Sequence, residues 1–212
     1  MKRQSRGTRG SGGATFLFVG NHPCLDFINT EMIVNGEPTD LLESFDDFIA
    51  WLVQVNLLTK AQAEAAGAEL SHTERTSLLE QAKTFRTTLR DLAARIVAGK
   101  SIPGSTITVI NQILSQRPGY PQLVRRKGGF EQRFHSAAAP VHNLLVPLAD
   151  AAGDLLCRVE FALIKKCGNP ACILYFYDTT KNHTRNWCSM QVCGNRMKVA
   201  AHYQRKRSQS GV

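Results

Sequence analysis

Residues 167–198 read CGNPACILYFYDTTKNHTRNWCSMQVCGNRMK, and they hold four of the six cysteines of this 212-residue chain. Four residues separate Cys167 from Cys172, fifteen separate Cys172 from Cys188, and four separate Cys188 from Cys193. Two thiolate pairs on tight turns, joined by a linker long enough for a hairpin, are a suitable donor set for tetrahedral zinc. Sulfur ligands favour Zn²⁺ over Ca²⁺ or Mg²⁺, and four protein ligands leave no open coordination position for catalysis. We therefore predict one structural zinc ion held by these four cysteines.

Other uses of clustered cysteines fit this spacing less well. Redox pairs normally have C-x-x-C spacing, and disulfides belong to oxidising compartments. Residues 1–13 are basic but lack the apolar stretch of a signal peptide, and no run approaches the ~18 apolar residues of a membrane helix, so we expect a reducing cytoplasm and no membrane contact. An iron–sulfur cluster also accepts four cysteines and stays open as an alternative.

The residues around the cysteines predict a small finger. Residues 172–180 alternate apolar and aromatic side chains as a strand would, and the polar residues 179–184 are typical of a turn. Trp187 precedes Cys188, where its indole can cover a thiolate. Good helix formers follow Cys193, so the second cysteine pair is expected at a helix start. The predicted order is knuckle, hairpin and helix, which is a treble-clef-like arrangement.

Positive charge is concentrated at the two ends of the chain. The net charge is +9; residues 158–212 contain ten basic and two acidic residues, residues 1–13 contain four basic residues and no acidic one, and residues 14–157 contain twelve basic and fifteen acidic residues. A basic module on a mildly acidic domain favours a polyanionic partner such as nucleic acid. Part of the basic surplus can instead offset the charge of about −2 on a zinc ion with four thiolates.

The remainder of the chain is predicted to be mainly helical. Apolar periodicity and capping boxes predict helices over residues 24–34, 45–55, from Thr59 onward, 71–99, 105–116 and 139–159, the last with a kink or boundary at Pro147. Residues 15–19 predict a strand, and Gly128-Gly129 predicts the turn of a β-hairpin over residues 121–136. The expected fold class is α+β. Its parts are a disordered basic tail (1–13), a helical domain with a few short strands (14–157), a four-cysteine zinc finger (158–207) and a disordered tail (208–212).

Two motifs resemble known families. The segment from Cys167 to Lys198, with Trp187-Cys188, Met190 and the tetrapeptide CGNR at 193–196, resembles the CGNR zinc finger. Upstream, CLDFINT at 24–30, Leu41-Leu42 and FIAWL at 48–52 resemble the ABATE domain that accompanies this finger. The resemblance implies a bacterial, stress-induced transcriptional regulator that binds DNA through a zinc finger and is associated with the nucleoid. It places all four cysteines on the family's ligand positions, and Arg196 and Lys198 on its basic positions.

The resemblance and the charge together predict nucleic-acid contacts at the C-terminus. The predicted residues are Arg185, Asn195, Arg196, Lys198, Arg205, Lys206 and Arg207. Asn195 could also bond across the knuckle, and Gly194 would let the backbone turn close to sulfur. Two alternatives to DNA binding stay open: the partner could be RNA, or the finger could be a zinc-stabilised module that binds an acidic protein.

A mixed polar and apolar run near the N-terminus predicts a ligand pocket. Asn21, His22, Asp26 and Asn29 lie within nine positions and could bind a small-molecule effector, so that the helical domain would sense a metabolite or associate as a homodimer. The alternative is a turn in which these side chains bond the local backbone. Cys24 with His22 as base would be a hydrolytic pair, but the sequence shows no second base or oxyanion device, and we expect no enzyme activity.

Overall fold

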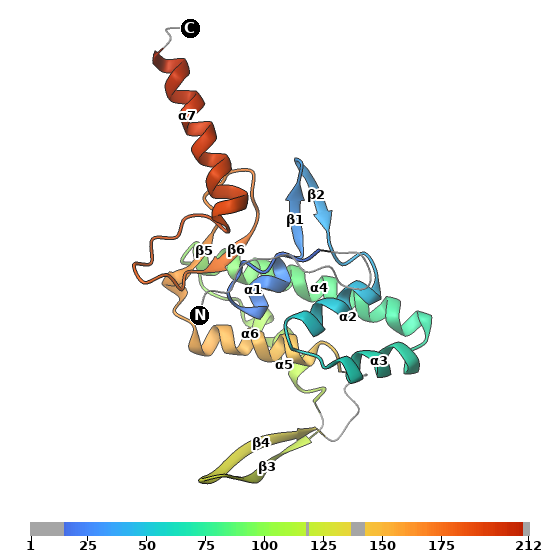
Figure 1. Ribbon diagram of the computed structural model, residues 1–212. Helices are drawn as coiled ribbons and strands as arrows, with labels where there is room; N and C mark the ends of the chain where they lie inside the picture. The colour runs from blue at the N-terminus through green and yellow to red at the C-terminus, as the bar shows by residue number, and fades with distance from the viewer. Residues whose placement is uncertain (1–14, 118, 137–142, 210–212) are drawn as a thin grey trace.

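The computed structural model describes residues 15–117, 119–136 and 143–209, and it has an α+β fold (Figure 1). Most helices form one body, and the strands form three separate two-stranded antiparallel sheets in the described residues. The basic tail predicted at residues 1–13 lies outside the described residues. Among the helices of the described parts, none is both long and apolar enough to span a bilayer.

Three consecutive helices begin where the sequence predicted them. They are α2 (Phe45–Gln54), α3 (Lys60–Glu69) and α4 (His72–Val97). Each follows a complete capping box, in which the N-cap hydroxyl accepts from the third helical N–H and the third side chain accepts from the N-cap N–H. The boxes are Ser44 with Asp47, Thr59 with Gln62, and Ser71 with Glu74. Local sequence alone therefore fixes the starts of these helices.

Two further helices follow the prediction, and one differs. Helix α5 (Gly104–Leu114) lies where expected, and α6 (Val146–Arg158) has Pro147 in its first turn, so this proline marks a boundary and no kink. The helix predicted over 24–34 is wrong in its second half. Helix α1 (Pro23–Ile28) ends early, and β1 (Glu31–Val34) pairs with β2 (Glu37–Asp40) through Asn35-Gly36, whose φ values of 52° and 92° suit a tight hairpin turn.

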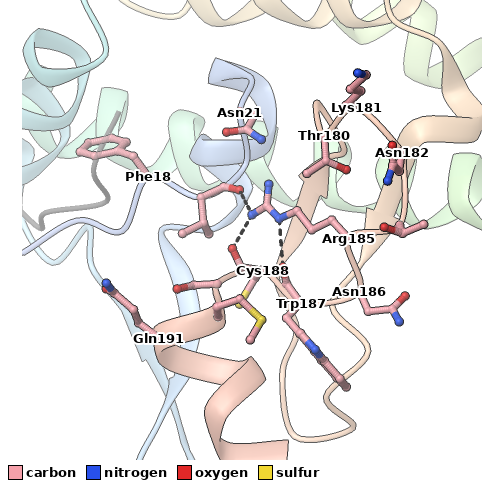
Figure 2. Close-up of a pocket in the computed structure, with 14 residues that line it drawn as sticks. Phe18, Asn21, Thr180, Lys181, Asn182, Arg185, Asn186, Trp187, Cys188 and Gln191 are labelled. Atoms are coloured by element: carbon pink, nitrogen blue, oxygen red, sulfur yellow. Dashed lines mark hydrogen bonds between the residues drawn. The ribbon is translucent and has the colours of Figure 1, made fainter. Parts of the chain in front are cut away.

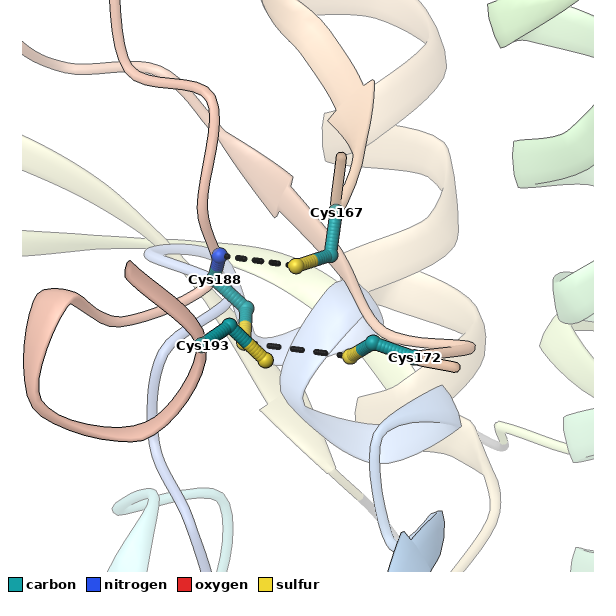
Figure 3. Close-up of side chains that lie close together, drawn as sticks. All are labelled: Cys167, Cys172, Cys188 and Cys193. Atoms are coloured by element: carbon teal, nitrogen blue, oxygen red, sulfur yellow. Dashed lines mark hydrogen bonds between the residues drawn. The ribbon is translucent and has the colours of Figure 1, made fainter. Parts of the chain in front are cut away.

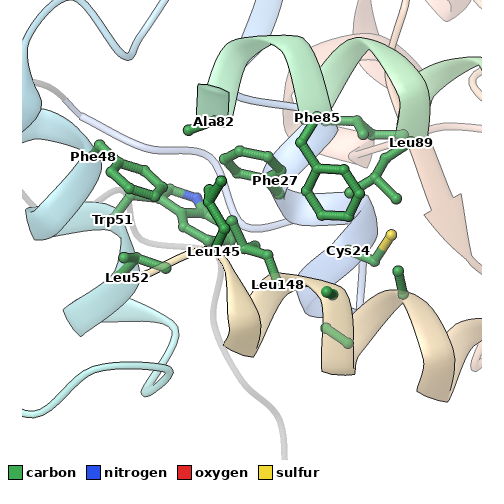
Figure 4. Packing of buried hydrophobic residues seen from close by; sticks show 14 of the residues in the cluster. Cys24, Phe27, Phe48, Trp51, Leu52, Ala82, Phe85, Leu89, Leu145 and Leu148 are labelled. Atoms are coloured by element: carbon green, nitrogen blue, oxygen red, sulfur yellow. The ribbon is translucent and has the colours of Figure 1, made fainter. Parts of the chain in front are cut away.

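The main core lies where α1, α2, α4 and α6 meet (Figure 4). Trp51 of α2 and Phe27 of α1 are fully buried, with ring centroids 5.0 Å apart. Leu89 from α4 and Leu148 from α6 close the core on either side. This packing makes α1 the central element that the longer helices surround.

Residues 16–19 do not form the predicted strand. They pair with no strand in the described residues, and they pack against both the helical domain and the finger. Phe16 is buried in the main core, whereas Val19 is buried in a second cluster formed by the finger. The apolar run that favoured a buried strand is therefore buried toward two different units.

The predicted hairpin after α5 is present. Strands β3 (Gly119–Arg126) and β4 (Gly129–Ser136) pair antiparallel, and the hairpin projects from the helical body on the side away from the C-terminus (Figure 1). The connection back to α6 includes residues 137–142, which are outside the described parts.

The finger follows α6 through a short 3₁₀ turn, η2 (Phe161–Leu163). It consists of β5 (Ile164–Lys166), β6 (Tyr175–Tyr177), a π-helical turn η3 (Met190–Gly194) and α7 (Asn195–Gln209). Strand β6 pairs with β5, which precedes the first cysteine pair, and the described residues between the two pairs contain no hairpin of their own. The hairpin predicted between the two cysteine pairs is therefore wrong, because the first pair, Cys167 and Cys172, lies in the loop of the β5–β6 hairpin. Helix α7 extends to Gln209, two residues into the tail predicted at 208–212.

Candidate metal centre

The four cysteine sulfurs point to one centre (Figure 3). Cys167 and Cys172 lie on the loop between β5 and β6, Cys188 lies just before η3, and Cys193 lies inside it. Their Sγ atoms are all within 4.8 Å of one another and all four residues are buried. The Sγ atoms of Cys172 and Cys188 are 3.9 Å apart, and those of Cys188 and Cys193 are 3.6 Å apart. Tetrahedral Zn–S bonds of ~2.3 Å require an S···S separation of about 3.8 Å.

The thiols need a cation to ionise together. Donation from the thiols of Cys172 and Cys188, and from the backbone N–H of Cys188, holds the pKa of Cys167 well below its usual value. The pKa values of Cys172 and Cys188 are raised, because the sulfur of Cys167 holds their protons by hydrogen bonding and burial disfavours further charge. Only a bound cation can stabilise four thiolates in this volume. The geometry and the donor set fit one structural Zn²⁺, which supplies that charge.

Hydrogen bonds around the sulfurs orient the ligands. The backbone N–H of Cys188 donates to Sγ of Cys167 (3.4 Å), and Nδ2 of Asn169 donates to Sγ of Cys193 (3.4 Å). Oδ1 of Asn169 accepts from the N–H of Ala171, which shapes the first knuckle. The bond across the knuckles that the sequence suggested for Asn195 is thus made by Asn169, while Asn195 is exposed at the start of α7. Such bonds to metal ligands strengthen binding of the ion.

Two glycines make room for Trp187. A Cβ on Gly168 would lie 3.2 Å from Cζ3 of Trp187, and a Cβ on Gly194 would lie 3.0 Å from Cδ1 of Trp187 and 2.5 Å from Sδ of Met190. The indole therefore lies between the two glycines that follow Cys167 and Cys193. It packs against the buried cysteine cluster as expected. Gly194 is required for the approach of Trp187 and Met190, and not for a turn at sulfur.

A buried carboxylate organises the loop between the cysteine pairs. Asp178 has no exposed side-chain surface, and it accepts from Nζ of Lys165 (2.7 Å), Oγ1 of Thr180 (2.6 Å) and the N–H of Arg185 (3.0 Å). Burial opposes its ionisation, but these donors outweigh it and hold the pKa of Asp178 below its usual range. Lys165 is therefore committed to this loop.

Arg185 has a different position from the one predicted. Its guanidinium lies 4.1 Å from the ring centroid of Phe176 and donates to the carbonyls of Trp187 (3.0 Å), Val19 (2.8 Å) and Cys188 (Figure 2). Burial lowers the pKa of Arg185, although neighbouring acidic groups counteract this. A guanidinium with these partners joins the finger to the N-terminal segment and does not reach outward toward phosphate.

The other six predicted nucleic-acid residues share one element. All are exposed on α7: Asn195, Arg196, Lys198, Arg205, Lys206 and Arg207. The structure thus brings these residues together on a helix that begins at the metal centre and separates them from Arg185.

The four residues predicted to bind a ligand all make hydrogen bonds within the protein. Nδ2 and Oδ1 of Asn29 pair with the carbonyl and N–H of Tyr175 (2.8 and 2.9 Å), and Nδ2 of Asn21 donates to the carbonyl of Tyr177 (2.9 Å). Oδ1 of Asp26 accepts from the N–H of Gly20 (2.7 Å). His22 caps α1 through Nδ1, and its Nε2 lies 3.4 Å from Oδ2 of Asp154. His22 and Asp26 bond the local backbone, as the alternative expected, whereas Asn21 and Asn29 bond the backbone of the finger across the domain junction.

A cavity of about 780 Å³ does exist at this junction, but of the four residues only Asn21 lines it (Figure 2). Its walls come from residues 18–21 of the N-terminal segment and residues 180–191 of the finger. The effector role remains a prediction, and this cavity is the place where a small molecule would contact both units.

Sequence reasoning missed the residues that join the two units and the knuckle residue Asn169. Arg90 of α4 donates to the carbonyls of Ile28, Glu31 (3.0 Å) and Ile173 (3.2 Å), a set that no linear pattern reveals. Asn169 did have a signal, because the tripeptide Cys-Gly-Asn occurs at 167–169 and again at 193–195.

Comparison with known proteins agrees with this architecture. The family described as "Putative stress-induced transcription regulator", named ABATE, matches residues 21–159, and the CGNR zinc finger matches residues 164–206. Neither is a family of enzymes. A search of curated proteins returns no match. This chain therefore belongs to the ABATE family and carries a CGNR zinc finger that holds one structural zinc ion.

Proposed function

We propose that this protein is a zinc-dependent transcriptional regulator that binds duplex DNA through α7. The observation that carries this proposal is the composition and exposure of that helix. Its fifteen residues include five Lys or Arg and no acidic residue, and the helix stands clear of the body (Figure 1). A free-standing basic helix has the dimensions of the DNA major groove.

The cations of α7 are distributed around the helix. At 100° per residue, Arg196 and Arg207 project from one side together with Val199 and Tyr203, whereas Lys198 and Arg205 project from another. A helix in a groove has phosphates on both flanks, so cations on two sides are the expected pattern. Val199 and Tyr203 are 55% and 64% exposed, which leaves apolar surface available for base edges such as the thymine methyl group.

The zinc ion positions the helix. Cys193 lies in η3, whose N-cap Ser189 accepts through its carbonyl from the N–H groups of Cys193 (2.9 Å) and Gly194 (3.0 Å). Because Asn195 begins α7 immediately afterwards, the metal centre fixes the direction in which α7 leaves the finger. An isolated fifteen-residue helix is marginal in water, so this anchoring and the duplex would both stabilise it.

The helical domain would transmit a signal or mediate association. The side chains of Asn29, Arg90 and Arg185 tie it to the finger, so a change in the domain or in the junction cavity would reorient α7. This supports a regulator whose two units act as one body.

Matched charge variants test the proposal. Arg205→Gln with Arg207→Gln removes two cations from α7 far from the zinc, and Lys60→Gln with Lys100→Gln removes two exposed cations from the helical domain. Affinity for a fluorescent random-sequence duplex is measured over a range of salt concentrations. Each phosphate contact contributes about 0.9 to the slope of log affinity against log salt, so the α7 pair should reduce the slope by about 1.8 and the control pair should leave it unchanged.

If the α7 pair and the control pair show the same slope of log affinity against log salt, the proposed role of α7 is refuted. Tighter, salt-dependent binding to RNA of the same sequence would identify RNA as the partner. The acidic-protein alternative is favoured by a different result. In that case the wild-type chain binds no duplex but captures a protein from a nuclease-treated lysate, and the α7 pair fails to capture that protein.

A further inference from the structure

The β3–β4 hairpin carries a charge opposite to that of the domain from which it projects. Residues 119–136 contain four basic residues and one acidic residue, a net charge of +3. The other residues of 14–157 contain eight basic and fourteen acidic residues, a net charge of −6. The hairpin stands away from the body (Figure 1), so these cations do not serve to balance the acidic surface beside them.

The strand register places cations on both faces of the hairpin. Arg125 pairs with Phe130 and Arg126 pairs with Gly129, so Lys127 lies in the two-residue turn. Because consecutive strand residues point to opposite faces, Arg125 and Arg126 project from opposite sides. Arg126 is bonded to Glu131 (2.6 Å), but both side chains are about half exposed, and such surface pairs exchange partners at little cost.

One face of the hairpin also exposes apolar side chains. Leu123 and Phe130 are 73% and 72% exposed, and they share their face with Arg125, whose guanidinium lies 5.5 Å from the Phe130 ring centroid. A stable protein interface buries about 800 Å² on each partner, which two side chains on a narrow ribbon do not supply. Two copies of this basic hairpin would also repel each other. The combination of cations and stacked aromatic surface is complementary to nucleic acid.

We propose that the β3–β4 hairpin is a second DNA-binding element, an arm that enters a groove of the duplex independently of α7. A two-stranded ribbon fits the major groove, and eight residues per strand give a reach of roughly 26 Å. Arg125 and Arg126 would each meet the phosphates of one groove wall, and Lys127 at the tip would meet phosphate beyond. Leu123 and Phe130, on the same face as Arg125, would contact the sugar surface of the wall that Arg125 meets.

The test uses the full-length zinc-loaded chain and the salt-dependence assay described for α7. Arg125→Gln with Lys127→Gln removes two cations and leaves the Arg126–Glu131 pair intact. The slope of log affinity against log salt should fall by about 1.8, as for the α7 pair, while Lys60→Gln with Lys100→Gln leaves it unchanged. Circular dichroism and zinc content confirm that each variant is folded.

The apolar face is tested separately. Phe130→Ser should weaken binding with no change in the salt slope, because it removes no charge. If the hairpin pair and the control pair show the same slope of log affinity against log salt, the proposal is overturned. The slope of the α7 pair then shows separately whether the finger binds DNA. Dissociation of a dimer by Phe130→Ser in sedimentation velocity, with duplex affinity unchanged, would also overturn it and identify a second copy of the chain as the occupant.

Discussion

Asn29 offers a sharp test of whether the predicted ligand residues are structural. Its side chain is 1% exposed and makes a donor and an acceptor bond to the backbone of Tyr175 in β6. Asn29→Ala leaves a buried N–H and a buried carbonyl without their partner. An unsatisfied buried group costs about 1–3 kcal/mol, so the loss of two should lower the free energy of unfolding by about 2–6 kcal/mol.

The matched control is Asn21→Gly, which removes the side chain at the same junction; glycine is used because Asn21 has a φ of 58°, a conformation that would strain alanine. Asn21 donates to the carbonyl of Tyr177 and to Oγ1 of Thr179, but its side chain is exposed, so water can replace it. Its loss should cost under about 1 kcal/mol.

Urea unfolding of the zinc-bound protein provides the measurement. Trp51 reports the helical core and Trp187 reports the finger, so fluorescence follows both units. With a slope of about 2 kcal/mol per molar urea, Asn29→Ala should lower the midpoint by about 1 M or more, and Asn21→Gly by under about 0.5 M. A midpoint unchanged by Asn29→Ala would refute the structural role and restore the ligand pocket.

Three further perturbations follow from the same contacts. Arg185→Gln removes the stacking on the Phe176 ring and the hydrogen bonds to backbone carbonyls, so it should lower the unfolding midpoint and speed the loss of zinc to a chelator. A fall of about 0.9 in the slope of log DNA affinity against log salt would instead show that Arg185 contacts phosphate. Gly194→Ala places a Cβ against Trp187 and should weaken zinc retention in a chelator competition; unchanged retention would contradict the packing described. Burial raises the pKa of Asp26 to about 7, so the folded chain holds a proton that the unfolded chain releases, and stability from this group is greatest below about pH 4 and falls as pH rises to 7. Asp26→Asn should flatten the stability profile between about pH 4 and 7, and a variant profile parallel to that of the wild type would exclude this titration.

The predictable parts of the fold depend on local sequence. The capping boxes that open α2, α3 and α4 use residues three positions apart, and the cysteine spacing places two ligand pairs on tight turns whatever the rest of the chain does. The hairpin β1–β2 also had a local signal, Asn35-Gly36, but the apolar spacing of residues 24–34 masked it.

The parts that sequence could not supply depend on long-range partners. Asn29 and Tyr175 are 146 positions apart, and Arg185 reaches Val19 across 166 positions. A buried asparagine or arginine has the same local sequence whether it binds a ligand, a phosphate or a backbone carbonyl. Strand β6 likewise pairs with β5 ahead of the first cysteines because the knuckle itself turns the chain, which a linear alternation of apolar residues does not reveal.

Zinc stoichiometry measured together with hydrogen exchange of residues 164–194 tests the central claim most directly. The account predicts one zinc per chain, protection of these amides while the metal is bound, and loss of that protection together with duplex binding when a strong chelator removes it. Purified protein without stoichiometric zinc, or a segment that keeps its protection and its affinity for DNA after the metal has gone, would contradict it.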